Sequence, residues 1–195
     1  MSTVRELYHS NRTYRDLINA AMHLIVERGY DAVSVTDITR AADYGRSTFY
    51  IYFENKEAML WALLEHHLHT MDAAIVQAVQ HLPQRERIFR AWVMIFRDIV
   101  QQRPFFLQLD SRLTDRLRLW QKQVLIDNLT RQLDEGLYSL ELEVAPNIGA
   151  RFIVGGLLEI LEDWLQHPER GTPEEMASQM YYLVFREKPC FSTDF

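Results

Sequence analysis

The spacing of apolar residues limits the possible folds more than any other feature, because they recur every three or four positions through most of the chain. Arg12 to Arg28 shows this well, with Tyr14, Leu17, Ile18, Ala21, Met22 and Ile25 as its apolar positions. Such spacing places apolar side chains on one face of a helix. Glycine and proline are scarce, with 7 and 6 in 195 residues, which disfavours turn-rich β folds. The sequence therefore predicts an all-α protein of about nine helices.

Composition narrows the class of protein further. Hydrophobic residues make up 48% of the chain, enough for a substantial core. The single cysteine, Cys190, cannot form an intrachain disulfide, so a reducing cytoplasm is expected. The N-terminus carries Arg5, Glu6 and His9 and lacks an apolar signal segment, and no apolar run is long enough to span a membrane. We expect a soluble, cytoplasmic protein without a membrane partner.

Two short helices are predicted between Ser34 and Phe53. Ser34 and Asp37 have the spacing of a capping box, which predicts a helix to about Ala42. Asp43, Tyr44 and Gly45 break that helix, and a second short one is expected from Arg46 to Tyr52. Asn55 then caps a long helix, and Pro83 and Pro104 are expected to separate later helices. Two short helices joined by a tight turn are typical of a helix-turn-helix, although plain core packing produces the same layout.

This part of the chain resembles the N-terminal DNA-binding region of the TetR/AcrR family of bacterial regulators, over about residues 12–60. The similar segments run from Ala20-Ala21 to Gly29-Tyr30, from Ser34 to Ile38, from Ser47 to Phe53 and from Asn55 to Leu60. The resemblance implies a helix-turn-helix DNA-binding domain at 1–54 and a helical ligand-binding and dimerisation domain at 55–195. It also implies a homodimeric repressor that a small-molecule ligand releases from a near-palindromic operator on double-stranded DNA.

The start of the second short helix has the side chains that base readout requires. Arg46, Ser47 and Thr48 are polar or cationic, and Arg46 could pair with a guanine or contact a phosphate. Thr36 stands at the positive end of the first short helix, where a phosphate could bind. The resemblance implies phosphate contacts for Tyr50, Tyr52 and Lys56. The predicted DNA-binding residues are Thr36, Tyr44, Gly45, Arg46, Ser47, Thr48, Tyr50, Tyr52 and Lys56.

The turn departs from the pattern of the family. Asp43 stands where the family usually has glycine, and we expect it to adopt the left-handed conformation that aspartate tolerates. Tyr44 replaces a small aliphatic residue and is expected to project toward DNA, and Gly45 replaces a polar cap. Phe49 and Phe53 are interpreted as core residues. The operator sequence therefore does not follow from the resemblance.

The resemblance also implies that the last two long helices, here about Asn147–His167 and Thr172–Arg186, pack against those of a second copy. Gly155 and Gly156 lower helix propensity by roughly 1 kcal/mol each, and close helix approach would compensate, either between copies or within one chain. The predicted dimer interface consists of Phe152, Gly155, Gly156, Leu157, Ile160, Trp164, Met180 and Tyr181.

Aromatic residues of the C-terminal part form the candidate ligand site. Such a set could line a pocket for a small apolar or aromatic ligand, although aromatic residues at helical spacing usually form core. The candidates are Trp61, Trp92, Phe96, Phe105, Phe106 and Trp120. The histidines at 66, 67 and 69 do not share one helix face, so neither a metal site nor a cofactor is predicted.

Other functions fit the sequence less well. A net charge of −6 argues mildly against nucleic acid, but residues 1–53 carry six basic and six acidic residues and are neutral. We find no glycine-rich phosphate loop, nucleophile elbow or histidine–glutamate zinc pattern, so an enzyme is not expected. Two alternatives stay open. One is a regulator controlled by a protein partner without a small-molecule inducer, and the other is a helical interaction module that has lost DNA binding.

Overall fold

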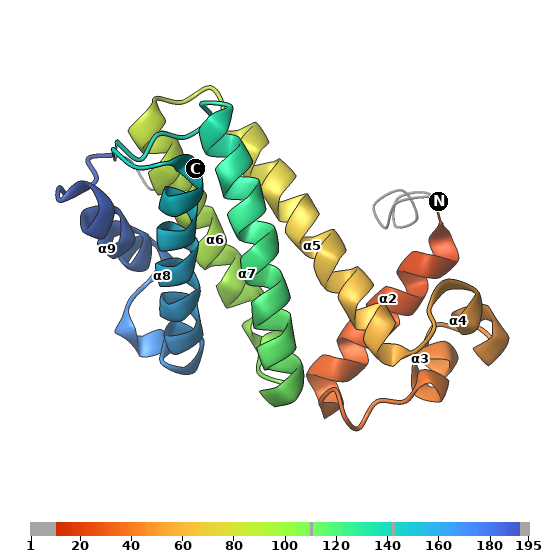
Figure 1. The fold of residues 1–195 in the computed structure, drawn as a ribbon. Coiled ribbons are helices and arrows are strands. Elements are labelled where there is room, and N and C mark those ends of the chain that lie inside the picture. The colour runs from red at the N-terminus through yellow and green to blue at the C-terminus, as the bar shows by residue number, and fades with distance from the viewer. Residues whose placement is uncertain (1–10, 110, 142, 192–195) are drawn as a thin grey trace. The chain divides into compact units, whose positions relative to one another are not determined.

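The computed structural model describes residues 11–109, 111–141 and 143–191 (Figure 1). Those residues form eight α-helices, one short 3₁₀ helix and no strand, which confirms the all-α prediction. The elements are α2 (Arg12–Arg28), α3 (Val35–Ala41), α4 (Arg46–Tyr52), α5 (Lys56–Val79), α6 (Gln84–Phe106), α7 (Ser111–Asp134), α8 (Pro146–Gln166), η1 (Pro168–Arg170) and α9 (Pro173–Phe185).

The chain divides into two compact units. The first runs to Ala74 and also includes Pro104–Asp110, and the second contains Ile75–Arg103 and the chain from Ser111 onward. Helices α5 and α6 therefore contribute to both units. The first unit is larger than the segment 1–54, and the functional division at residue 54 stays a prediction.

Several helix ends follow from local sequence as predicted. The Ser34 side chain accepts from the Asp37 amide while Asp37 accepts from the Ser34 amide, so the capping box is confirmed at α3. Asn55 Oδ1 accepts from the Ala58 amide at 2.8 Å, which caps α5. Gly29 ends α2 with a φ of 82°, a conformation that favours glycine.

One predicted helix end is wrong. Helix α6 does not stop before Pro104 but continues through it to Phe106. A proline removes one backbone donor and crowds the preceding turn, but near the C-terminal end of a helix few hydrogen bonds remain to be lost. The helix break expected at Pro104 comes only after Phe106.

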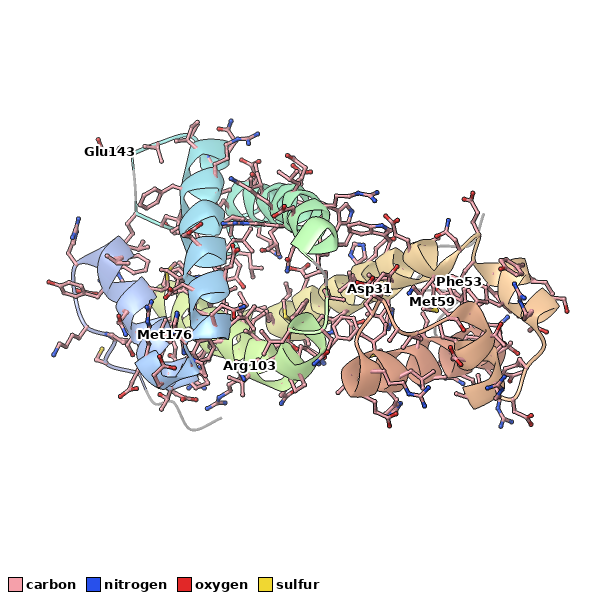
Figure 2. The ribbon with its side chains drawn as sticks, turned by 90° about the horizontal axis from the view of Figure 1, so that it is seen from below. Asp31, Phe53, Met59, Arg103, Glu143 and Met176 are labelled. Carbon is pink, nitrogen blue, oxygen red and sulfur yellow. The ribbon has the colours of Figure 1, made fainter. Side chains whose placement is uncertain are left out.

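Aromatic and aliphatic side chains from the first four described helices form the core of the first unit. Phe49 of α4, Ile38 of α3 and Leu17 of α2 are each fully buried. Phe53 packs against Tyr14, with ring centroids 4.9 Å apart. Figure 2 labels Phe53 together with Met59, another buried member of this core. The prediction that Phe49 and Phe53 are core residues is confirmed.

In the second unit, α7 packs along α8 through Ile126, Val154 and Leu158. Phe96 of α6 meets Trp164 of α8 edge to face, with centroids 5.3 Å apart. An ion pair between Arg97 Nε and Glu174 Oε1, 2.8 Å apart, joins α6 to α9. Among the described residues, no helix is both long and apolar enough to cross a membrane.

Candidate nucleic-acid interface

A tight turn sets the direction of α4 relative to α3. Asp43 has a φ of 60°, which confirms the left-handed conformation expected of it. The Tyr44 amide donates to the Thr39 carbonyl at 2.8 Å, and the Asp43 amide donates to the Arg40 carbonyl at 3.2 Å. These bonds use the carbonyls at the end of α3, so the chain reverses without leaving them unpaired. The turn fixes α3 and α4 as a helix-turn-helix.

Helix α4 has one buried face and one outward face. Phe49 points into the core at 0% exposure. On the other side, Arg46 and Ser47 are exposed, and Tyr50 and Ile51 are 50% and 74% exposed. Only the buried face is needed for packing. The outward face is therefore available for a partner.

Arg46 and Tyr50 lie on one side of α4, one helical turn apart. The Arg46 Nη2 donates to the Tyr50 hydroxyl at 3.5 Å. Gly45, the N-cap of α4, and Ser47 are exposed beside them, and Thr48 is half-buried. The structure therefore brings together four of the predicted DNA-binding residues at the outward N-terminal part of α4, and these are Gly45, Arg46, Ser47 and Tyr50.

Two predicted contacts are hydrogen-bonded to residues at the N-terminal end of α2. The Tyr44 hydroxyl donates to Asp16 Oδ2 at 3.0 Å, so its phenol reaches back to α2. Asn11 Nδ2 donates to the Tyr52 hydroxyl at 2.9 Å, while Asn11 Oδ1 caps α2 through the Tyr14 amide. Both tyrosines fix α4 and the preceding turn against α2. Their contact with DNA stays a prediction.

Lys56 is also bound within the first unit. Its Nζ donates to the Tyr30 and Val33 carbonyls, each at 2.7 Å, and lies 4.0 Å from the centroid of the Tyr30 ring. Thr36, in the first turn of α3, is half-buried. Lys56 and Thr36 are both less exposed than Arg46. Contact of either residue with DNA stays a prediction.

The start of α3 has a distinct local electrostatic character. Hydrogen bonds from the Ser34 hydroxyl and then the Ser34 amide lower the pKa of the Asp37 carboxyl below its ordinary value. Arg40 and Arg28 lower this pKa further through their charges. Asp37 is therefore ionised at neutral pH, and its charge is compensated by the capping bonds and by neighbouring arginines.

Sequence reasoning missed three residues in this region. Ile51 is the most exposed large apolar side chain of the helix-turn-helix, next to Tyr50. Its position could have been inferred, because Phe49 and Phe53 fix the buried face of α4 and Ile51 lies between them. Asn11 and Asp16 hold the two tyrosines, and nothing in their spacing indicates that pairing.

The predicted dimer residues divide into two groups. Leu157, Trp164, Met180 and Tyr181 are buried inside the second unit, and the Trp164 indole donates to the Gly171 carbonyl at 3.1 Å. Phe152 is 65% exposed, Gly156 is exposed, and Gly155 and Ile160 are half-buried. Sequence reasoning missed further exposed apolar residues in these helices or just before α8, which are Val144, Ile148, Tyr182 and Leu183.

Packing against the described residues does not explain two of the three glycines of α8. A Cβ atom built on Gly155 or on Gly156 would meet none of the described atoms within 4 Å. At Gly149, by contrast, the added Cβ would lie 2.9 Å from Leu140 Cδ1. Close approach inside the chain therefore explains Gly149 and leaves Gly155 and Gly156 unexplained.

The predicted ligand residues come from both units. Trp61, Phe105 and Phe106 belong to the first unit, and Trp92, Phe96 and Trp120 belong to the second. Phe96 and Phe105 are buried, Trp92 packs on Tyr181 with centroids 6.4 Å apart, and the Trp61 indole donates to Glu57 at 3.1 Å. Trp92 and Phe96 are core residues of their unit. A ligand site at these residues stays a prediction.

The turn, the outward face of α4 and the helical second unit together define a helix-turn-helix protein with a C-terminal helical domain. Residues 17–63 match the family model described as bacterial regulatory proteins, tetR family. The N-terminal part of the chain therefore contains a domain that matches the TetR family. The earlier resemblance is thus confirmed.

Similar proteins agree with this assignment. The uncharacterised HTH-type transcriptional regulator YwcC of Bacillus subtilis is 45% identical over 53 residues, which cover 27% of this chain and 24% of that protein. A putative TetR-family transcriptional regulator from Syntrophomonas wolfei has a TM-score of 0.71 at 21% identity, over 88% of this chain and 92% of that one. The structure of SmeT with triclosan has a TM-score of 0.70 at 17% identity, over 94% and 96%. The sequence match thus spans about a quarter of YwcC, and the structural matches show the fold.

Proposed function

We propose that this protein is a transcriptional regulator that binds double-stranded DNA as a homodimer. We propose further that it is a cytoplasmic repressor, released from a near-palindromic operator by a small apolar or aromatic ligand. Two copies of α4 would occupy successive major grooves, about 34–36 Å apart. The DNA-reading part corresponds to the segment 1–54, and residues 55–195 would serve ligand binding and dimerisation.

The outward face of α4 carries this proposal. It presents an arginine, a serine and a tyrosine that the fold does not need for packing, on the second helix of a helix-turn-helix. A guanidinium can bind guanine O6 and N7 bidentately, while hydroxyl groups bind bases or phosphates. Further exposed arginines of the same unit would add phosphate-binding charge, and these are Arg12, Arg15, Arg28 and Arg40.

Helix α8 supports the homodimer. Ile148, Phe152 and Gly156 recur every four residues and therefore lie on one face, where two large apolar side chains are exposed beside a glycine. A second copy would cover these side chains and use the open space over Gly155 and Gly156. Of the predicted interface residues, only the exposed or half-buried ones would contact the second copy, and these are Phe152, Gly155, Gly156 and Ile160. The four buried residues would pack beneath them.

The ligand is supported by similarity of fold and by chemistry. SmeT, whose structure contains triclosan, shares the fold of this chain at low sequence identity. The aromatic residues predicted to contact a ligand would suit a flat apolar molecule. Release from DNA requires that the ligand bind more tightly to a conformer that does not fit the operator.

The test is fluorescence anisotropy of purified protein with a labelled duplex from upstream of its own gene. A genome-fragment selection supplies the site if that duplex fails. We expect two protomers per site, resistance to random competitor DNA, and affinity that falls steeply with salt. Ligands are then screened by their ability to release the protein from this duplex.

Arg46→Ala is the informative variant, and Arg131→Ala on α7 is its matched control. Losing one base contact should weaken binding about 5- to 150-fold, corresponding to about 1–3 kcal/mol. The control should bind as the wild type does. If no genomic fragment is bound more tightly than random DNA, the repressor proposal is wrong and an interaction module is favoured.

A further inference from the structure

Tyr44 lies in the turn directly before Gly45, the N-cap of α4. Its amide donates to the Thr39 carbonyl at 2.8 Å, and its hydroxyl donates to Asp16 Oδ2 at 3.0 Å. The backbone of Tyr44 is therefore bonded to α3, and the far end of its side chain is bonded to α2. A small aliphatic residue, which the family usually has at this position, has no hydroxyl for the second bond.

Asp16 lies on α2, one helical turn after Arg12. The carboxylate oxygen that accepts from Tyr44 also lies 3.5 Å from Arg12 Nε, and the side chains of Arg12 and Asp16 are 85% and 37% exposed. An ion pair as exposed as this one contributes little to stability. A carboxylate close to a DNA-binding helix also repels phosphates. What Asp16 can contribute to DNA binding is therefore its bond to Tyr44.

A second bond of the same kind holds the other end of α4. Asn11 Nδ2 donates to the hydroxyl of Tyr52, the last residue of this helix, at 2.9 Å. Of the seven residues of α4, all of which the structure describes, only Phe49 is buried, and it lies at the middle of the helix. Bonds at the two ends of a short helix restrict its tilt more than one side chain at its middle does. The two tyrosine hydroxyls therefore fix the tilt of α4 on α2.

We propose that Asp16 is a positioning residue that increases discrimination between the operator and random DNA. It holds Tyr44, and with it the start of α4, at the tilt that contacts with base edges require. Random DNA is bound mainly through its phosphates, and this attraction depends much less on the exact tilt of the helix. The proposal rests on the proposed DNA-binding function, and Asp16 acts in this role through Tyr44.

The experiment measures affinity for the operator and for random duplex by fluorescence anisotropy and compares the ratio of the two. Tyr44→Phe removes only the hydroxyl, and we expect it to lower this ratio about fivefold while affinity for random DNA is unchanged. Asp16→Ala should lower the ratio to the same extent. Asp16→Asn removes the charge but keeps an oxygen acceptor, so it should retain the wild-type ratio.

The double variant with Asp16→Ala and Tyr44→Phe separates this role from an independent contact of either side chain with DNA. If both side chains act through one bond, the double variant should have the same ratio as either single variant. Losses that add would overturn the proposal. Equal losses toward operator and random DNA in Tyr44→Phe would also overturn it, because they indicate a phosphate contact of the hydroxyl. So would failure of Asp16→Asn to retain the ratio.

Asp127→Ala on α7 is the matched control for loss of one exposed carboxylate, and circular dichroism shows that each variant is folded. Hydrogen exchange of residues 44–52 without DNA tests the bond by itself. Exchange there should be faster in Tyr44→Phe and Asp16→Ala than in Asp16→Asn or wild type, and unchanged exchange would refute the positioning role. If the wild type binds no genomic fragment more tightly than random DNA, the proposed function fails, while the exchange result still decides whether Asp16 holds α4.

Discussion

Helices α4 and α8 each bury one face and leave the other outward, but the two outward faces differ in chemistry. On α4 the outward side chains include Arg46, Ser47 and Tyr50, which donate and accept hydrogen bonds. On α8 they include Ile148 and Phe152, with Gly156 one turn further. The first face suits the polar edges and phosphates of DNA, and the second suits the apolar surface of another protein.

This difference also indicates how much each helix depends on its partner. Helix α4 is only seven residues long and is fixed by Phe49 and its turn, so its outward side chains can be replaced without unfolding it. Helix α8 carries three glycines that lower its helix propensity, and packing against the described residues does not explain Gly155 and Gly156. Substitutions on α4 should therefore change DNA binding, whereas substitutions on α8 should change self-association.

The largest expected effect is on self-association. Phe152→Asp places a charge in the centre of the proposed interface and should weaken the dimer about 30-fold or more, at least about 2 kcal/mol. Sedimentation velocity across a concentration series measures the change. Leu119→Asp on α7 is the control, because Leu119 is also exposed, at 72%, and lies outside the proposed interface. A dimer that tolerates Phe152→Asp would place the interface elsewhere.

The corresponding substitution on α4 is Ile51→Ala. An aliphatic side chain in the major groove contacts the methyl group of thymine, and its removal should cost about 1 kcal/mol, or roughly fivefold in operator affinity. Replacing each operator thymine in turn by deoxyuridine removes only the methyl group. At the contacted position, Ile51→Ala should then have no further effect. If the two losses add at every thymine, Ile51 does not read a methyl group.

Local features of the chain were predicted better than contacts between distant residues, for a physical reason. Caps and turns depend on neighbouring residues, so the Ser34–Asp37 box and the left-handed Asp43 could be inferred from a few letters. Pairing between distant residues could not. The bonds of Tyr44 to Asp16 and of Lys56 to Tyr30 join positions 28 and 26 residues apart, and only the folded chain shows them.

Periodicity was also insufficient to separate the two faces of α8. Leu157 and Trp164 were assigned to the dimer interface, yet both are buried within their own unit. A helix that is apolar on most sides has no single stripe to identify its core face. Gly155 and Gly156 show the same limit, because a sequence cannot distinguish approach within one chain from approach between two.

Gly156→Ala should change the stability of the separated chain and the affinity of the two copies for each other in opposite directions. In the separated chain, alanine should stabilise α8 by about 1 kcal/mol, because its Cβ meets none of the described atoms. In the dimer, the same Cβ should hinder close packing and weaken association by a similar amount, about fivefold. Thermal unfolding at low and high protein concentration separates the effects. Gly149→Ala is the contrasting variant, because its Cβ would lie 2.9 Å from Leu140 Cδ1 and the Leu140 side chain would have to shift, so alanine should stabilise the protein less there than at Gly156, at both concentrations.

The smallest expected effect concerns the cap that positions α3 ahead of α4. Ser34→Ala removes the hydroxyl that accepts from the Asp37 amide, and should lower the free energy of unfolding by about 0.5–1 kcal/mol at neutral pH. Chemical denaturation measures this, with Thr172→Ala as a matched loss of the corresponding cap on α9.

The effect of Ser34→Ala should depend on pH with a definite sign. The Ser34 hydroxyl is the largest cause of the lowered pKa of Asp37 in the folded protein. A carboxyl with a lowered folded pKa adds stability that is fully present above its ordinary value of 3.8 and is lost as pH falls through the lowered value. The difference between wild type and Ser34→Ala should therefore be constant from about pH 5 to 7 and shrink below about pH 4. A difference that stays constant on acidification would mean that the pKa of Asp37 does not depend on Ser34, and that the cap of α3 acts through the hydroxyl alone.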